Sequence, residues 1–488
     1  MRTAALVAIG GNICKVCTLW ALMKVAATSL STADYGLFFL ARRILVFLPA
    51  LTFLGVSNTM VRYVAAMRER DVERGNIVVA NFLLVAMMQS AFLVASTIGQ
   101  RPLATLYFGV NQTSSLYWSA VLMSVVFVFY FYLKGYCIGM MFVGWGTVLD
   151  IVLFTGWPLL AFFVIAGPSP EDILWFQLIG SGLLIGVGIA CMLYRERHAF
   201  KQLCWVHLLS GIKIAVAFGM SRYFGNLLDT VLVVLGPWLL RASLHEVAYL
   251  TSAMIIIRSV EAGIGSLASF VSSATSNLIA TRRLAEVNTA ISLAVNLGIP
   301  IGLVASAFCF FFGAHIVLLL LGREYLEHAV YLQVISLSLL PLLLFQLLKG
   351  IIEAKYLFPH NSFNVGIGLV AFVVSYAVFR HVSSEGLAVA LAYVVAYCVI
   401  ATLSVWCVRR AISLGEILDW RNGSVACVSF LCLYFLSQRV TLLSGMVGLA
   451  QLAGIGTLVA AIHIMGLYGI GARNLMIIRR ALSPRGLG

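Results

Sequence analysis

The sequence is poor in charge. Only 10% of its 488 residues are Asp, Glu, Lys or Arg, whereas 62% are apolar and the mean hydropathy is +1.02. A soluble globular chain carries about 25% charged residues, so this composition excludes one. Apolar blocks of about 20 residues, long enough to cross the hydrocarbon core of a bilayer, follow one another with short polar breaks. The composition therefore predicts an all-α polytopic membrane protein.

Acidic residues are the scarcer of the two signs, with 18 against 32 basic residues and a formal net charge of +14. This excess needs no nucleic acid to explain it, because Lys and Arg in short loops mark the cytoplasmic side of a membrane protein. Most basic residues outside the apolar blocks lie in alternate breaks, from Arg2 through Arg70, Arg195 and Arg282 to Arg480. We therefore expect both termini in the cytoplasm, contacts with membrane lipids, and no nucleic-acid partner.

The sequence signatures of a cleaved signal peptide, a disulfide framework, a metal site and a nucleotide-binding loop are missing. The first apolar block carries Lys15 and Lys24 and no cleavage pattern, so we expect it to be retained rather than removed as a signal peptide. Most of the ten cysteines lie within or beside apolar blocks, which predicts no disulfide framework. Cys14 and Cys17 have no second pair of ligands near them in sequence, so no metal site is expected. No GxxxxGK[ST] motif occurs, and we expect no cofactor.

The number of spans follows from the apolar blocks. We predict about fourteen transmembrane helices, at 4–29, 37–63, 78–99, 115–133, 145–167, 172–194, 211–240, 247–278, 290–321, 329–350, 364–380, 386–408, 424–440 and 443–470. Twelve or thirteen are the alternatives, because the block at 424–440 is short and Gly313 and His315 interrupt the block at 290–321.

The chain repeats itself at an interval of about 212 to 215 residues. The short acidic turn at 31–37 matches the one at 243–249, and the Leu-Lys-Gly at 133–135 matches the one at 348–350. Six spans in each repeat, both starting on the same side, imply two parallel six-helix lobes. Such lobes hold a substrate near the midplane and alternate access by rocking, so the repeat indicates a transporter.

The repeat sets the predicted domains. Residues 1–200 form the N-terminal lobe, 201–410 the C-terminal lobe, and 411–488 two additional spans followed by a basic cytoplasmic tail.

Charges inside the spans are the candidate functional residues. Those well inside are Lys15, Lys24, Arg42, Arg43, Arg222, Asp229, Arg258 and Glu261. A charge at the centre of a span costs about 2.5–3.5 kcal/mol, so the six cations cost on the order of 15–20 kcal/mol before any pairing, and two carboxylates do not neutralise them.

The first two spans carry cations at similar depth. Lys24, Arg42 and Arg43 have no nearby acid except Asp34 in the connecting turn, so they form a predicted positive cluster for an anion. The alternative is that Lys24 only anchors the helix at the membrane surface. Adjacent helical positions point about 100° apart, so we also expect one of the two arginines to be structural.

The seventh and eighth spans carry polar stripes. Asp229 shares a helix face with Arg222, and Glu261 follows Arg258 by three residues. The second pair has the alternative role of locking two helices together. A diphosphate accepts paired hydrogen bonds from guanidinium groups, so a lipid-linked diphosphate is a suitable ligand for this excess of basic residues inside the spans. The predicted substrate-binding residues are Lys24, Asp34, Arg42, Arg43, Arg222, Asp229, Arg258 and Glu261.

Several short motifs occur in a characteristic order. LSTADYGLF at 30–38 precedes a long helix ending in GVSN at 55–58, and LGREY at 321–325 precedes LKG at 348–350. This pattern resembles the polysaccharide or oligosaccharide flippases of Wzx type, within the multidrug/oligosaccharidyl-lipid/polysaccharide exporter superfamily. The resemblance covers roughly residues 5 to 410.

The resemblance implies a function and partners. It implies translocation of a polyprenyl-pyrophosphate-linked oligosaccharide across the bacterial inner membrane by alternating access through a basic central cavity. A polysaccharide polymerase and export machinery are the further partners it implies. Lipid-linked peptidoglycan-precursor flippases of the superfamily use arginines on the first, second and eighth helices and an aspartate near the first turn. The matching positions are Lys24, Arg42 or Arg43, Arg258 and Asp34, with Lys replacing Arg on the first helix.

Two alternatives stand beside the flippase. A cation-coupled multidrug antiporter of the same superfamily would need carboxylates within the membrane, and Asp150, Asp229 and Glu261 are outnumbered by cations. A membrane glycosyltransferase, ligase or polymerase would need catalytic carboxylates on a sizeable outer loop, whereas every predicted outer loop is short. We therefore do not expect an enzyme.

Overall fold

The computed structural model describes residues 2–53, 55–67, 71–109, 114–198, 205–280, 284–356, 359–409, 420–439, 448, 451–452 and 454–459, with the side chains of some helical residues outside the description. Within these ranges every regular element is a helix, which confirms the predicted all-α class. Seven described helices are long and apolar enough to cross a membrane, and two bent pairs of helices bring the number to as many as nine.

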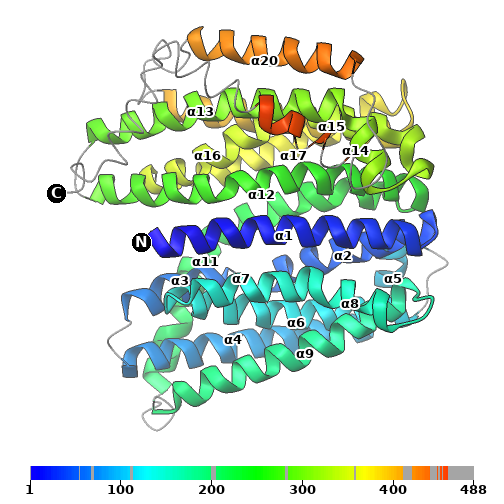
Figure 1. The fold of residues 1–488 in the computed structure, drawn as a ribbon. Helices are drawn as coiled ribbons and strands as arrows, with labels where there is room; N and C mark the ends of the chain where they lie inside the picture. The colour runs from blue at the N-terminus through cyan, green and yellow to red at the C-terminus, as the bar shows by residue number, and fades with distance from the viewer. Residues whose placement is uncertain are drawn as a thin grey trace. The chain divides into compact units, whose positions relative to one another are not determined.

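The first compact unit comprises residues 1–251 (Figure 1). Its helices are α1 (Arg2–Ser29), α2 (Thr32–Thr52), α3 (Val56–Ala66), α4 (Asp71–Ile98), α5 (Gln100–Phe108), α6 (Ser114–Gly139), α7 (Val143–Ile151), the π-helical turn η1 (Val152–Gly156), α8 (Trp157–Val164), α9 (Pro170–Arg195) and α11 (Trp205–Leu239). The apolar residues of α6 form the centre of the unit, because α6 packs against α2, α3 and α9. Tyr117, Tyr130 and Tyr132 of α6 are among its largest fully buried side chains.

The second compact unit comprises residues 252–488. It contains most of α12 (Leu244–Ala280), then α13 (Leu284–Phe311), α14 (Gly313–Leu320), the short helix η2 (Arg323–His328), α15 (Ala329–Ser336), α16 (Leu339–Lys355), α17 (His360–Phe379), α18 (Glu385–Val408) and α20 (Trp420–Arg439). The predicted span at 443–470 lies mostly outside the described residues. The predicted lobes at 1–200 and 201–410 stay a prediction. The helix α11, which begins after residue 200, packs against α2, α3 and α4 within the first unit.

Three predicted spans are interrupted. The span predicted at 37–63 divides into α2 and α3 at Gly55, whose φ of +70° is a conformation that favours glycine. At this point the backbone of Gly219 in α11 comes so close that a Cβ on Gly55 would lie 2.7 Å from its carbonyl oxygen. The span predicted at 290–321 bends by 68° between α13 and α14, and the one at 329–350 bends by 43° between α15 and α16.

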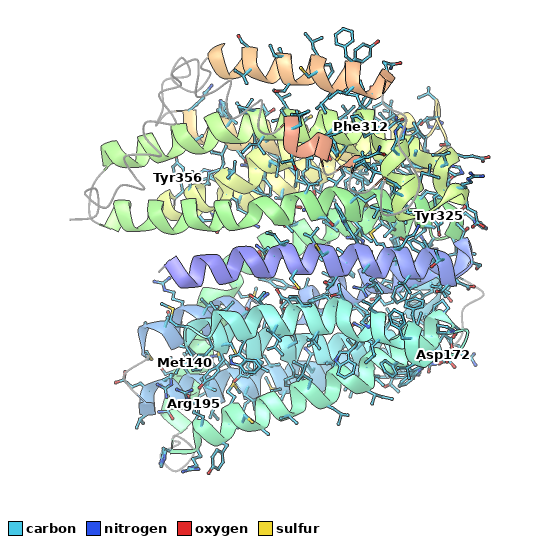
Figure 2. The ribbon with its side chains drawn as sticks, viewed as in Figure 1. Met140, Asp172, Arg195, Phe312, Tyr325 and Tyr356 are labelled. Atoms are coloured by element: carbon cyan, nitrogen blue, oxygen red, sulfur yellow. The ribbon has the colours of Figure 1, made fainter. Side chains whose placement is uncertain are left out.

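A buried ion pair joins three helices of the first unit at one end. Arg74 of α4 donates to both carboxylate oxygens of Glu196, with its Nε 3.1 Å from Oε1, and the hydroxyl of Tyr136 of α6 donates to Oε1 at 2.6 Å. Arg74 and Glu196 are only 5% and 3% exposed. Figure 2 shows Met140 and Arg195 at this end of the unit and Asp172 at the opposite end. From the sequence, the basic residues in this region are expected only to set the orientation of the chain in the membrane.

Candidate functional site

A cluster of charges lies within the first unit around Asp150 of α7. Lys134 of α6 places its Nζ 2.8 Å from Oδ1 and 2.9 Å from Oδ2 of this carboxylate. Lys15 of α1 places its Nζ 3.5 Å from Oδ2, and the hydroxyl of Tyr130 donates to Oδ1. The carboxylate is thus shared by two cations that reach it from different helices.

Phe154 brings a third cation to the same place. Lys15 Nζ lies 5.7 Å from the centre of the Phe154 ring, and Arg42 of α2 donates from Nη2 to the Phe154 carbonyl oxygen. Phe154 belongs to the π-helical turn η1, which follows the helix carrying Asp150. π-helical turns occur frequently at functional sites. We therefore take Lys15, Arg42, Lys134, Tyr130 and Asp150 as the candidate site of the first unit.

Arg42 is partly committed to holding α2 in place. Its guanidinium lies 5.4 Å from the ring centre of Phe38 and 5.9 Å from that of Phe39. These contacts and the bond to Phe154 fix the side chain, yet its buried Nη1 has no hydrogen-bond partner among the described residues. Arg42 therefore keeps a donor for a further acceptor. The neighbouring Arg43 is half-buried on the next position of α2.

Two other residues predicted for the first two spans are exposed. Lys24 is exposed on α1. Asp34 is exposed at the start of α2, where Ser31 Oγ donates to its Oδ2 at 2.7 Å and the Asp34 amide donates back to Ser31 Oγ at 3.1 Å. Ser31 is therefore the N-cap of α2, and Asp34 binds the hydroxyl of this cap from the first turn of the helix. The predicted role of Asp34 in substrate binding, like that of Lys24, stays a prediction.

The seventh predicted span corresponds to α11. Asp229 lies on this helix and is half-buried. The side chain of Arg222 lies outside the part of the chain that the structure describes, so the predicted polar stripe on this helix stays a prediction. Tyr223, beside it, donates to the Leu51 carbonyl oxygen at 2.9 Å and so ties α11 to α2.

The second unit contains the predicted pair of Arg258 and Glu261. Arg258 Nη1 lies 2.6 Å from Glu261 Oε2, and its Nη2 donates to the Tyr397 hydroxyl of α18. Gln346 of α16 donates to Glu261 Oε1 at 2.6 Å. The pair therefore joins α12 to α16 and α18, which is the helix-locking role that the sequence left open.

A small pocket accompanies this pair. Its volume is about 10 Å³, about the minimum that holds one water molecule. Arg258, Tyr393, Tyr397, Ser338, Met254 and Leu342 are among its lining residues. The binding role predicted for Arg258 and Glu261 stays a prediction beside their structural one.

Sequence reasoning missed the centre of the first unit's site. Lys134 lies outside the fourth predicted span, which ends at residue 133, and Asp150 was considered only as one of three carboxylates outnumbered by cations. The helix α6 continues to Gly139, so Lys134 lies within it and reaches Asp150. The spacing of Tyr130 and Lys134 by four residues, with Asp150 inside the next apolar block, was the available signal. Among the residues that the structure describes, no group of three or more His, Cys, Asp or Glu side chains is placed to hold a metal ion.

Comparison with solved structures shows which fold this is. A multidrug resistance MATE family transporter of the MOP superfamily, in an inward-facing conformation, aligns with 83% of this chain and 98% of its own, with a TM-score of 0.64 and 19% identity. The lipid II flippase MurJ, in an inward closed conformation, aligns with 98% of this chain and 100% of its own, with a TM-score of 0.72 and 13% identity. A mutant of the Vibrio cholerae MATE transporter VcmN aligns with 84% and 95%, with a TM-score of 0.61 and 10% identity.

The fold of this chain is therefore that of the MATE transporters and of MurJ, which confirms the predicted architecture at the level of the fold. No protein-family model and no curated protein sequence matches the chain.

Proposed function

We propose that the chain is a flippase that moves a polyprenyl-pyrophosphate-linked oligosaccharide across the bacterial inner membrane by alternating access, through a basic central cavity. One observation carries the proposal: Lys15 and Lys134 share the carboxylate of Asp150, and Phe154, whose ring lies beside Lys15, accepts a hydrogen bond from Arg42. When these groups are ionised, the cluster has a net charge of about +2. A diphosphate carries about the opposite charge and offers many acceptor oxygens.

The extent of the fold likeness supports the same proposal. The MATE structures align with 83% and 84% of this chain, whereas MurJ aligns with 98% of it. MurJ is by its name a flippase of lipid II, and the chain resembles its fold over almost the whole length of both chains. The polymerase and the export machinery implied by the resemblance to Wzx-type flippases stay predictions.

A cation-coupled multidrug antiporter is the second candidate, because MATE multidrug transporters share the fold. Such a protein needs a carboxylate open to a cation. Asp150 is 13% exposed at its side chain and already faces two lysines, and Glu261 is held by Arg258 and Gln346. Both carboxylates are thus occupied by partners from the chain itself, which favours an anionic substrate.

Translocation in reconstituted vesicles tests the proposal. The full chain is reconstituted with a fluorescent polyprenyl-diphosphate glycan, and the fraction of label that crosses to the other leaflet is measured with an impermeant quencher. We expect Lys15→Ala and Arg42→Ala to lower the initial rate at least about tenfold, and Arg42→Lys to lower it because lysine lacks the planar fork of arginine. Arg101→Ala is the matched control, since Arg101 is exposed on the short helix α5.

Two results would contradict the proposal. Wild-type rates in all three variants would refute a role for this basic cluster in translocation. Proton- or sodium-driven export of a cationic dye, with no movement of the lipid-linked glycan, would establish the antiporter instead.

A further inference from the structure

The two lysines that face Asp150 hold it unequally. Lys134 contacts both carboxylate oxygens, at 2.8 and 2.9 Å, whereas Lys15 contacts only Oδ2, at 3.5 Å. The Lys15 side chain is also the more exposed of the two, at 36% against 27%. A longer and more exposed contact in a higher-dielectric environment is the weaker one. The pair of Lys15 and Asp150 is therefore the part of the cluster that separates most easily.

The remaining partners keep the carboxylate satisfied when Lys15 leaves. Tyr130 and Lys134 are four residues apart on α6, so they lie on one face of that helix and reach Asp150 together. Lys15 comes instead from α1. Departure of Lys15 thus leaves Asp150 with a cation and a hydroxyl donor, and avoids the cost of an unpaired buried charge.

We propose that Asp150 is a resident counter-ion that competes with the diphosphate of the substrate for Lys15. This inference rests on the proposed function. In the empty protein Lys15 pairs with Asp150. When a diphosphate enters, the Lys15 ammonium turns to a phosphate oxygen, and Asp150 stays paired with Lys134. On release Lys15 returns to Asp150, so the carboxylate replaces the leaving diphosphate as the anionic partner of Lys15.

Competition has a signature that a purely structural ion pair does not have. If Asp150 only held α1 in place, its neutralisation would disorder the site and weaken anion binding. If Asp150 competes for Lys15, its neutralisation frees Lys15 and strengthens anion binding, while the slower release lowers the rate of translocation. The two roles therefore predict opposite changes in affinity.

The experiment is a double-mutant cycle on residues 15 and 150. Isothermal titration calorimetry measures the binding of inorganic pyrophosphate to the full chain in detergent. We expect Asp150→Asn to lower the Kd for pyrophosphate at least about fivefold, and Lys15→Gln to raise it at least about fivefold. In the double variant the Asp150 substitution should not change the Kd further, because the competed ammonium group of Lys15 has already been removed. Asp150→Glu keeps the competing charge and should keep the wild-type Kd within about twofold.

Several outcomes would overturn the inference. An unchanged or higher Kd in Asp150→Asn contradicts competition, and an Asp150 effect that persists without Lys15 assigns the competition to another cation. If Asp150→Asn does not purify as a monodisperse protein, Lys15→Gln decides alone, since an unchanged Kd would remove Lys15 as the competed group.

The proposed flippase function has a separate readout. Translocation of the fluorescent lipid-linked glycan in vesicles is measured on the same wild-type preparation. If the chain translocates the glycan but the Kd for pyrophosphate is the same in all variants of the cycle, the counter-ion role of Asp150 is refuted and the flippase function is not. The expected binding cycle without translocation refutes the flippase and leaves the anion site in place.

Discussion

Replacing Gly36 by alanine tests a close backbone contact between two helices of the first unit. Gly36 lies in the first turns of α2, and a Cβ at this position would lie 2.0 Å from the Leu244 carbonyl oxygen, 2.9 Å from its carbonyl carbon and 3.2 Å from the Ala248 nitrogen. These neighbours are backbone atoms of α12, so no side chain can rotate away. The two helices would have to separate by more than about 1 Å to reach ordinary contact distances. Overpacking of this kind costs about 1–3 kcal/mol.

The higher helix propensity of alanine partly offsets the cost of overpacking, so the experiment needs a control for it. Alanine gains up to about 1 kcal/mol over glycine inside a helix, so we expect Gly36→Ala to destabilise by up to about 2 kcal/mol after this gain is subtracted. Gly186→Ala in α9 is the matched control, because nothing lies within 4 Å of a Cβ there. Apparent midpoints of thermal unfolding in one detergent and at one scan rate should shift down for Gly36→Ala and stay level or rise for Gly186→Ala. A Gly36→Ala midpoint at or above that of the wild type would refute the close contact.

Two further predictions concern the first unit. Glu196→Ala leaves the buried Arg74 without its carboxylate, and we expect a loss of about 3–5 kcal/mol, seen as a lower apparent unfolding midpoint than that of the exposed control Glu73→Ala; equal midpoints would contradict the buried pair. Ser169→Ala removes the capping box that Ser169 forms with Asp172 at the start of α9, and we expect a loss of about 1 kcal/mol, measured as faster limited proteolysis near that turn; unchanged cleavage would contradict the cap.

The class of protein and the course of most spans could be predicted from sequence because they depend on composition. Twenty or so apolar residues in a row have one stable form in a bilayer, and helices such as α9 and α18 lie within a few residues of the predicted spans. Gly313 predicts an interruption of its apolar block, and the structure has a 68° bend beside it. The break at Gly55 was missed, because it depends on how closely Gly219 approaches from a distant part of the chain.

The site was harder to predict because it depends on which helices meet. A charge census finds Lys15 and Arg42, but periodicity within one helix says nothing about a partner on another. Asp150 becomes central only because α1 and α6 both pack against α7. For the second unit the spacing of Arg258 and Glu261 was sufficient, because the two residues belong to one helix and pair within a single turn.

The position of Lys15 also bears on how the protein is made. This residue lies in the middle of α1, where an ammonium group costs about 2.5–3.5 kcal/mol to place in hydrocarbon. Its carboxylate partner, Asp150, is synthesised much later, on the order of 10 s afterwards at about 5–20 residues per second. During that interval α1 has to keep Lys15 in contact with water or lipid headgroups. The first helix of the chain is thus expected to settle in the membrane only after the fifth predicted span has emerged from the ribosome.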